Sequence, residues 1–310
     1  MKDLSIIIPV LNEEPNILPL YNKLVPVLKK ITQNYEIIYV DDGSKDGTFS
    51  KLKELHQKDK NLKVIRFRRN FGKAAALSAA FNMASGKVVI TMDGDLQDEP
   101  AEIPHFLEEL QKGYDMVTGW KANKHKEAYF RRLPSLLFNR LASRLSGLRI
   151  HDFNCPFKAY RNEVVKELNL YGEMHRYIPA LAHWNGYRIG EIKVLNYPRK
   201  FGKTKYSTSR ILKGFLDLIT VKYLMSYKSR PLHLFGSIGL LFTLMGALSG
   251  MYMVYQWAIG VGIGKRPLLM LSALMTMIGI QFCSIGLLAE MITNNAEKAQ
   301  KSYSIKEVLK

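Results

Sequence analysis

The sequence is poor in cysteine, and it lacks two common phosphate-binding loops. Its two cysteines, Cys155 and Cys283, are far apart, and Cys283 falls in an apolar segment. A disulfide framework is therefore not expected, and a reducing cytosol fits. Neither GxGxxG nor GxxxxGK[ST] occurs, so neither a dinucleotide fold nor a P-loop is supported. Acids and a proline follow the start too closely for a signal peptide, which is also not expected.

Acidic residues are outnumbered. The chain has 27 Asp and Glu against 45 Lys and Arg, for a formal net charge of +18. Residues 121–149 and 199–230 carry most of the excess. Nucleic acid, an anionic membrane surface or a phosphorylated ligand would each match such patches, and a solvated basic surface is the alternative. No basic-and-aromatic RNA-binding motif accompanies them, so we expect no nucleic-acid partner.

Two long uncharged runs occupy the C-terminal third. Residues 232–258 carry no charge if His233 is neutral, and residues 267–289 carry none. Each run exceeds the roughly 20 helical residues needed to cross a hydrocarbon core about 30 Å thick. A pair of buried helices in a soluble domain is the alternative, which the length and the small residues disfavour. We therefore predict two transmembrane helices at about 232–258 and 267–289.

The basic residues predict the orientation of this hairpin. A short loop joins the two spans, so both ends lie on one side of the membrane. Residues 207–228 alternate basic and apolar residues at helical spacing, which is typical of amphipathic helices in the interface. The positive-inside rule then places both ends in the cytoplasm, as in a multi-pass protein of an inner or plasma membrane. The predicted parts are a cytoplasmic N-terminal domain (1–206), juxtamembrane helices (207–230), the hairpin (231–290) and a cytoplasmic tail (291–310).

The N-terminal two thirds alternates strand-like and helical segments. The strand-like runs are 4–10, 35–40, 62–67, 87–92 and 115–119, and helical patterns fall at about 14–31, 47–59, 72–84 and 101–112. This alternation indicates βαβ units and a mainly parallel sheet. The strands are apolar throughout, as expected when helices cover both faces.

Polar residues follow three of these strands. Asn12 and Glu13 follow the first, Asp41 and Asp42 the second, and Asp93, Asp95 and Asp98 the fourth. Ligands of such sheets bind beyond the carboxyl ends of the strands, so the three clusters should converge on one crevice. Carboxylates repel a phosphate, but they accept hydrogen bonds from ribose and base, and they hold a divalent cation that in turn holds phosphates.

Four motifs carry a resemblance to a known family. They are Pro-x-x-Asn-Glu (9–13), Asp-Asp-Gly-Ser-x-Asp (41–46), Asn-Phe-Gly-Lys (70–73) and Asp-x-Asp-Leu-Gln-Asp-x-Pro (93–100). In this order they resemble the family 2 glycosyltransferases of GT-A fold, a Rossmann-like α/β architecture. More narrowly, the chain is similar to polyprenyl-phosphate glycosyltransferases such as dolichol-phosphate mannose synthase and the bacterial enzymes that load a sugar onto undecaprenyl phosphate. The likeness continues through 153–161, 198–207 and the hairpin.

The resemblance implies a metal and a nucleotide-sugar donor. Asp93, Asp95 and Gln97 would hold Mg²⁺ or Mn²⁺ against the donor diphosphate. The implied donor-binding residues are Pro9, Asn12, Glu13, Asp41, Asp42, Lys73, Asp93 and Gly94. Either Asp41 or Asp42 would face the base. Asp98, although it belongs to the same polar cluster, is expected to be the N-cap of the next helix and not a ligand. Asp46 is also expected to be a helix N-cap.

It also implies an acceptor site and catalytic groups. The acceptor phosphate would meet Arg131, Arg132, Arg199, Lys203 and Lys205. Catalysis would fall to Asp95, Asp152 and Arg131, although Cys155-Pro156 replaces the family's usual glycine and puts the role of Asp152 in doubt. His151 and His175 are expected to be ordinary loop or core histidines.

The implied reaction is a single inverting displacement at the sugar C1 by a lipid monophosphate oxygen. This phosphate is largely dianionic at neutral pH, so no strong general base is needed. The motifs do not specify the donor; a UDP-hexose such as UDP-glucose or UDP-N-acetylglucosamine is favoured, with GDP-mannose second. A membrane-tethered homotetramer is also implied. Three alternatives remain: a phosphohydrolase using Asp93, a processive polysaccharide synthase, and a membrane scaffold with a vestigial site.

Overall fold

The structure, a computed structural model, divides the chain into two compact units, Met1–Lys222 and Tyr223–Lys310. It describes residues 2–121, 143, 146–170, 172, 174–197, 231–264 and 266–297, and side chains as far as residue 292. The predicted acceptor residues Arg131, Arg132, Arg199, Lys203 and Lys205 lie outside the described residues. So do the predicted juxtamembrane helices and most of the tail, and the predicted domain boundaries there stay predictions.

The first unit is built on one mixed sheet in the order β3-β2-β1-β4-β6-β5-β7. Its strands are β1 (Lys2–Val10), β2 (Tyr35–Asp41), β3 (Leu62–Arg66), β4 (Gly86–Thr91), β5 (Met116–Trp120), β6 (Lys158–Arg161) and β7 (Ile189–Lys193). Strand β6 runs antiparallel to both β4 and β5, and the other pairings are parallel. The carboxyl ends of the six remaining strands therefore share one edge of the sheet.

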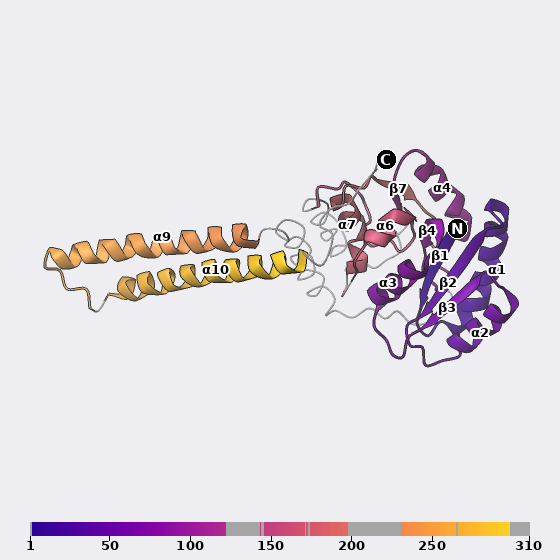
Figure 1. Cartoon of the computed structure of the whole chain (residues 1–310), viewed down its shortest axis with the longest axis horizontal. Helices are drawn as coiled ribbons and strands as arrows, with labels where there is room; N and C mark the ends of the chain where they lie inside the picture. The colour runs from indigo at the N-terminus through magenta and orange to yellow at the C-terminus, as the bar shows by residue number, and fades with distance from the viewer. Residues whose placement is uncertain are drawn as a thin grey trace. The chain divides into compact units, whose positions relative to one another are not determined.

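Helices cover both faces of this sheet (Figure 1). They are α1 (Glu14–Ile31), α2 (Thr48–Lys58), α3 (Lys73–Met83), the 3-10 turn η1 (Pro100–Glu102), α4 (Ile103–Gln111), α6 (Asn162–Glu167), the 3-10 turn η3 (Met174–Arg176) and α7 (Ile178–Trp184). Helix α1 packs against α2 and η1, whereas α3 packs against α6 and η3. This arrangement is the GT-A-like fold that the sequence predicted.

The pattern of burial explains why the sheet forms where it does. Residues on one face of β1, such as Ile6 and Ile8, are fully buried against Ile17 and Leu20 of α1. Ile7, on the opposite face of the same strand, is also fully buried. Strands with two covered faces are apolar without alternation, as the sequence indicated. All five predicted strands and all four predicted helices are present, displaced by at most a few residues.

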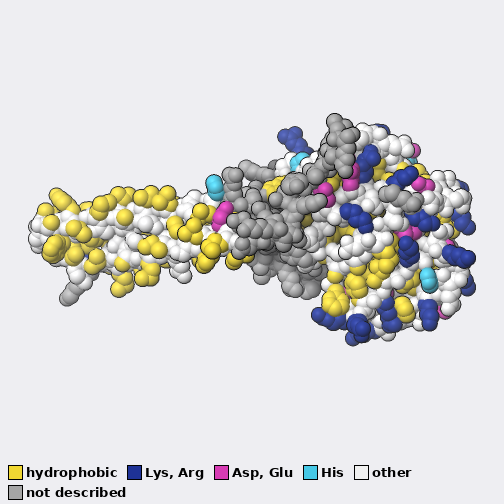
Figure 2. Space-filling view, in the orientation of Figure 1, with side chains coloured by type: hydrophobic (Ala, Val, Ile, Leu, Met, Phe, Trp, Pro, Cys, Tyr) yellow, Lys and Arg dark blue, Asp and Glu magenta, His cyan; other side chains and the backbone are white. Residues whose placement is uncertain are grey.

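The second unit contains two long helices, α9 (Pro231–Ala258) and α10 (Pro267–Glu297). Both are long and apolar enough to cross a membrane, and only 11% of the best window in each is buried. A core helix of a soluble protein would be mostly buried. Figure 2 shows hydrophobic side chains along the surface of this hairpin, whereas Lys and Arg are scattered over the first unit. The predicted span 267–289 is thus part of a longer helix.

Candidate active site

The site lies at the carboxyl edge of the parallel strands. Strand β6 begins at the same edge, because Lys158 pairs with Thr91 of β4 and with Thr118 of β5. The loops that follow β1, β2, β3 and β4 therefore meet the loop that precedes β6. This is the crevice that the sequence predicted for an open α/β sheet.

The first two loops are joined by hydrogen bonds. The Asn12 amide donates to Ser44 Oγ at 2.9 Å, and Asn12 Oδ1 accepts from the Lys45 amide at 2.8 Å. Asn12 has a φ of 51°, a left-handed conformation that asparagine tolerates better than most residues. The Glu13 amide donates to Thr48 Oγ1 at 2.9 Å. The first two polar clusters therefore converge as predicted.

The two neighbouring aspartates make different contacts. The Asp42 carboxylate accepts hydrogen bonds from the amides of Phe71 and Gly72, at 2.7 and 3.0 Å, and so fixes the loop between β3 and α3. Asp41 is fully buried, and its Oδ1 accepts from the Ser44 amide at 2.8 Å. Asp41 Oδ2 has no hydrogen-bond partner within 3.5 Å among the described residues, and the exposed Arg66 guanidinium lies 3.6 Å away from it as an ion-pair partner. Of the two, Asp41 keeps an acceptor for a ligand.

Asp46 links the starts of two helices. Its Oδ1 accepts from the Thr48 amide at 3.0 Å, in the first turn of α2, and its Oδ2 accepts from the Glu14 amide of α1 at 3.3 Å. Glu14 Oε2 in turn accepts from the Gly47 amide at 3.0 Å. The prediction that Asp46 is the N-cap was wrong, because the N-cap of α2 is Gly47, although the Asp46 carboxylate does accept from the first amide of that helix.

The DxD turn follows β4 directly. Asp93 and Asp95 flank Gly94, where a Cβ atom would lie 2.6 Å from Val10 Cγ1, so only glycine fits against β1. Asp95 is 4% exposed, and its Oδ1 accepts from the Gln97 amide at 3.2 Å. These contacts fold the turn tightly and keep both carboxylates at the carboxyl end of the sheet.

Asp93 forms an ion pair with Lys73, the first residue of α3. Burial raises the pKa of Asp93, but the Lys73 ammonium more than offsets this effect and holds the pKa below its usual value. Asp93 is therefore ionised at neutral pH and already compensated by a cation. Lys73, expected at the donor diphosphate, thus lies beside the DxD turn.

The interpretation of Asp98 as a helix cap was wrong. The N-cap of η1 is Glu99, and no side chain caps that turn. Asp98 is instead 2% exposed, its Oδ2 accepts from the Asp93 amide at 3.1 Å, and its Oδ1 lies 2.7 Å from Lys121 Nζ. Burial lowers the pKa of Lys121, but Asp98 more than offsets this and raises it. Asp98 therefore links the backbone of the DxD turn to the buried Lys121 side chain.

A distant segment pairs with the same turn. Asp98 and Asn196 form an antiparallel bridge, the Tyr197 amide donates to the Gln97 carbonyl at 3.0 Å, and Gln97 Nε2 donates to the Tyr197 carbonyl at 3.3 Å. The chain therefore enters the predicted acceptor segment 198–207 immediately beside the DxD turn. Sequence reasoning did not foresee this pairing, because about 100 residues separate the two strands of the bridge.

The loop before β6 brings Asp152 to the same edge. Asp152 is 3% exposed, its amide donates to Glu191 Oε1 at 3.1 Å, and its Oδ1 accepts from the Asn154 amide at 3.2 Å. Its catalytic role stays a prediction. His151 is largely exposed, lies 2.6 Å from Glu191 and stacks on Trp120, as an ordinary surface histidine does.

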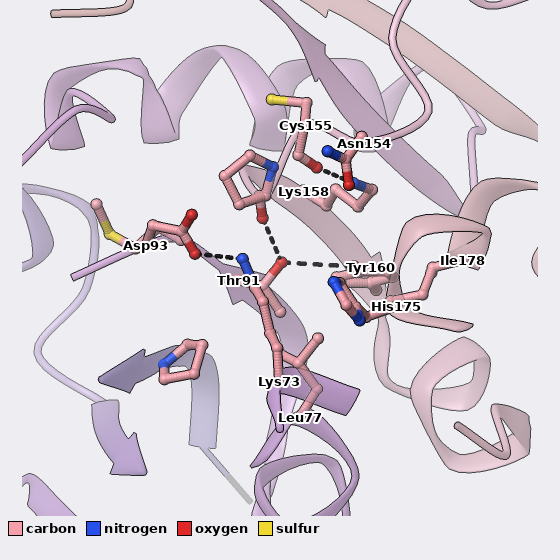
Figure 3. Close-up of a pocket in the computed structure, with 13 residues that line it drawn as sticks. Lys73, Leu77, Thr91, Asp93, Asn154, Cys155, Lys158, Tyr160, His175 and Ile178 are labelled. Carbon is pink, nitrogen blue, oxygen red and sulfur yellow. Dashed lines mark hydrogen bonds and ion pairs between the residues drawn. The ribbon is translucent and has the colours of Figure 1, made fainter. Parts of the chain in front are cut away.

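A cavity lies beside the DxD turn, and Figure 3 shows side chains that line it. Pro9, Lys73 and Asp93, all predicted donor residues, line one part of it, and Asn154, Lys158 and His175 are among the residues that line the rest. Lys158 and His175 are site residues that sequence reasoning missed or dismissed. The sequence did hold one signal for Lys158: a single lysine inside the otherwise apolar run Pro156–Tyr160.

The side chains at the turn suit a divalent cation of the magnesium type. Among the described residues, no group of three or more His, Cys, Asp or Glu side chains could hold a metal by itself. Mg²⁺ and similar hard cations, however, are commonly held by one or two carboxylates together with substrate phosphates and water. Asp93 and Asp95 provide such a pair, whereas Asp98 is already paired with Lys121. Gln97, the third predicted ligand, uses its amide nitrogen on Tyr197.

Comparison with known proteins identifies the family. The family model described as "Glycosyl transferase family 2" matches residues 5–168, which is more than half of the chain. The chain belongs to glycosyl transferase family 2. A second model, described as "GtrB C-terminal hairpin", matches residues 230–294. The resemblance inferred from the four motifs and the hairpin is therefore confirmed.

Relatives that match over the full length of the chain show which members of the family it is similar to. The chain is 36% identical to a dodecaprenyl-phosphate galacturonate synthase of Rhizobium johnstonii, over 99% of this chain and 93% of the relative. It is 32% identical to an undecaprenyl-phosphate 4-deoxy-4-formamido-L-arabinose transferase of Serratia proteamaculans, over 100% of this chain and 94% of the relative. This family 2 chain is thus a glycosyltransferase similar to polyprenyl-phosphate enzymes.

Solved structures confirm the fold. Glucosyl-3-phosphoglycerate synthase from Mycobacterium tuberculosis, in complex with Mn²⁺ and UDP-glucose, superposes with a TM-score of 0.55 at 18% identity. The match covers 71% of this chain and 79% of that one. At this identity the likeness establishes the GT-A fold and nothing about substrates.

Proposed function

We propose that the protein transfers a sugar from a nucleotide-sugar donor, favoured as a UDP-hexose, to a polyprenyl phosphate at a membrane. The observation that carries this proposal is the convergence of Asp41, Asp93 and Asp95 at one edge of a GT-A sheet in a chain that also contains an apolar hairpin. The full-length relatives, named for galacturonate and formamido-arabinose transfer to polyprenyl phosphates, support it.

The nucleoside would bind between the first two loops. Asp41 offers a buried carboxylate oxygen that only the ion pair with Arg66 at 3.6 Å engages in the described part of the chain, which suits a donor N–H of a uracil base. Asn12 and Glu13 form the adjacent wall and are held to the β2–α2 loop by their backbone contacts. Pro9 lines the adjoining cavity, and Gly94 lets the turn that carries Asp93 and Asp95 pack against Val10 of β1. Asp42 fixes the β3–α3 loop rather than contacting the base.

Asp93 and Asp95 would hold Mg²⁺ or Mn²⁺ at the donor diphosphate. When bound, this cation offsets the charge that develops on the departing nucleotide. Lys73, on the other side of Asp93, is in reach of the same diphosphate and supplies a further positive charge. The protein positions the Asp93 and Asp95 carboxylates. Gly94 allows a tight turn between them, and Asp98 holds the Asp93 amide through a hydrogen bond.

The acceptor phosphate would bind to basic residues outside the described part of the chain. Arg131, Arg132, Arg199, Lys203 and Lys205 are the proposed anchors, with Arg131 and Asp152 nearest to the reacting phosphate. The position of Tyr197 beside Gln97 supports this assignment, because it starts the basic segment next to the DxD turn. A phosphate oxygen then displaces the nucleotide at the sugar C1 with inversion. Orientation toward the cytoplasm and assembly into a homo-oligomer are parts of the same proposal.

The test is direct synthesis of a lipid-linked sugar. The purified full-length protein in detergent is incubated with undecaprenyl phosphate, Mg²⁺ or Mn²⁺, and labelled UDP-sugars or GDP-mannose. Label should enter the organic phase, and chelation by EDTA should stop its transfer. We expect Asp95→Asn to lower kcat by at least about 100-fold, since it removes a metal ligand, while the thermal melting temperature changes little.

Glu109→Gln is the matched control, because the Glu109 side chain forms an ion pair with the exposed Lys112 at the end of α4 and is not part of the DxD turn. It should retain full activity. Near-normal transfer by Asp95→Asn would contradict the metal assignment. Release of free sugar or phosphate without lipid-linked product would instead support a hydrolase, and polymer formation would support a processive synthase.

A further inference from the structure

The cavity is lined by a buried lysine that forms no ion pair with a carboxylate of the described residues. Lys158 lines the cavity and is 2% exposed. Its ammonium donates to the Cys155 carbonyl, and no carboxylate of the described residues forms an ion pair with it. Asp152 and Asp93 attract it only at longer range. A buried ammonium is costly without a counter-ion, so the geometry favours an anion supplied from outside.

The rest of the lining agrees with this charge imbalance. Lys73 is compensated by Asp93, so the charged groups that line the cavity sum to one positive charge, that of Lys158. His175 Nδ1 is buried and has no hydrogen-bond partner in the part of the chain that the structure describes. Burial, together with Lys73 and Arg176, lowers the pKa of His175 to about 3, so this ring stays neutral and adds no charge. Burial also lowers the pKa of Lys158 to about 8, which still leaves the ammonium predominant at neutral pH.

The position of the cavity indicates which ligand reaches it. Pro9, Lys73 and Asp93, which carry the proposed donor site, line the same space as Lys158 (Figure 3). A functional group on the donor sugar would therefore enter first. A carboxylate brings one negative charge, which matches the single uncompensated ammonium. A phosphate dianion would bring two beside Asp93.

We propose that this cavity receives the carboxylate of a hexuronic acid donor and that Lys158 selects for it. The inference rests on the proposed function and specifies its donor: a nucleotide-activated uronic acid rather than a neutral hexose. The Lys158 ammonium pairs with the carboxylate oxygens, and the Asn154 side chain, which lines the same cavity, is in place to hydrogen-bond the ligand. Neutral hexoses would leave the buried ammonium without a counter-ion.

The experiment compares donors that differ only at this carboxylate. Transfer to undecaprenyl phosphate is measured with UDP-galacturonate against UDP-galactose, and with UDP-glucuronate against UDP-glucose. We expect kcat/KM to favour one or both uronates by about 10- to 100-fold, the usual range for a hydrogen-bonded charge pair. Lys158→Met should remove that preference mainly by lowering uronate transfer. Lys53→Met, at an exposed site on α2, should leave it unchanged.

The outcomes separate this inference from the proposed function. If neither sugar of either pair, nor any other donor, yields lipid-linked product, the proposed function fails. If neutral hexoses are transferred as well as uronates, the carboxylate inference alone fails. Should Lys158→Met slow all donors equally and raise KM for the lipid phosphate, the cavity binds the acceptor and the inference is overturned. If this variant does not fold, calorimetric binding of UDP-galacturonate and UDP-galactose to the wild-type protein decides, and equal affinities overturn the inference.

Discussion

A buried charge pair lies directly behind the DxD turn. Lys121 and Asp98 are 8% and 2% exposed, and their side chains lie 2.7 Å apart. Removing one partner strands the other as an uncompensated buried charge, which costs about 3–5 kcal/mol. We expect Asp98→Asn to lower the free energy of unfolding of the first unit by this amount, measured by denaturation in detergent.

The double variant Asp98→Asn with Lys121→Met tests the pairing. If the two charges compensate each other, this variant should be more stable than Asp98→Asn alone, because no unpaired charge remains. Additive losses would show that each side chain acts independently. Because Asp98 also accepts from the Asp93 amide, both variants should impair transfer, whatever their stability.

A second buried acid predicts how stability depends on pH. Glu36 of β2 is fully buried, and burial alone would raise its pKa. Hydrogen bonds from Lys63, Ser5 and Ser85 instead lower the pKa of Glu36 to about 2. Since the folded-state pKa is depressed, the stabilisation is complete above the unfolded value of about 4.3 and is lost as pH falls toward 2.

The expected loss over this window is about 3 kcal/mol, an upper value because Lys63 is partly exposed. Thermal melting of the first unit between pH 6 and pH 2 measures it. Glu36→Gln should flatten the profile, and Glu54→Gln, on the exposed face of α2, should not. A wild-type profile that matches the Glu36→Gln profile would contradict the assignment.

Sequence patterns predicted the elements that are long or strongly apolar. Strands β1, β2 and β4 and helices α1 and α3 were expected within a few residues of their observed ends. Strands β6 and β7 and helices α6 and α7, of four to seven residues, were not expected, because short elements carry little periodicity; of the strands of five residues or fewer, only β3 and β5 were predicted.

The same reason explains what was missed at the site. Asp41, Asp93 and Asp95 follow recognisable strands, so their convergence could be predicted from the parallel topology. Lys158 begins a four-residue antiparallel strand, and its place at the same edge follows only from tertiary pairing with Thr91. The role of Asp98 likewise depends on Lys121, a contact that no local pattern reveals.

The two helices of the hairpin approach each other at glycines. A Cβ atom at Gly279 would lie 2.5 Å from the Thr243 amide and 2.6 Å from the Gly239 carbonyl. Gly279→Val should therefore force the helices apart and cost about 1–3 kcal/mol or more. We expect a lower melting temperature of the hairpin in detergent, followed by circular dichroism.

Gly262 provides the control for this element. It lies in the loop between the helices, and a Cβ atom there would meet nothing within 4 Å. Gly262→Val should melt like the wild type. Equal melting of both variants and the wild type would show that the helices do not pack through Gly279.

At the scale of the whole molecule, the unequal distribution of charge predicts which side of the membrane each part faces. We expect the loop between α9 and α10 to lie outside the cytoplasm and the first unit inside. A cysteine at Ile263, in that loop, should react with an impermeant maleimide on intact cells or spheroplasts. A cysteine at the exposed Glu54 should react only after permeabilisation.

Cys155, which is buried, and Cys283, which is partly buried, are both free thiols. Both are replaced by serine or alanine, so that only the introduced cysteine can react with the maleimide. The replacement must first retain transfer activity. Labelling of the Glu54→Cys protein on intact cells, or protection of the Ile263→Cys protein there, would contradict the predicted orientation.

The bridge between Asp98 and Asn196 makes the two halves of the site thermodynamically inseparable. One strand of this bridge continues from the residues proposed to hold the donor, and the other leads into the residues proposed to hold the lipid phosphate. Whatever free energy the donor contributes to fixing segment 195–197, the acceptor gains, and the reverse holds by the same amount. We therefore expect donor and acceptor to raise each other's affinity by the same factor, through a short stretch of backbone pairing and not through the chemistry at the sugar carbon.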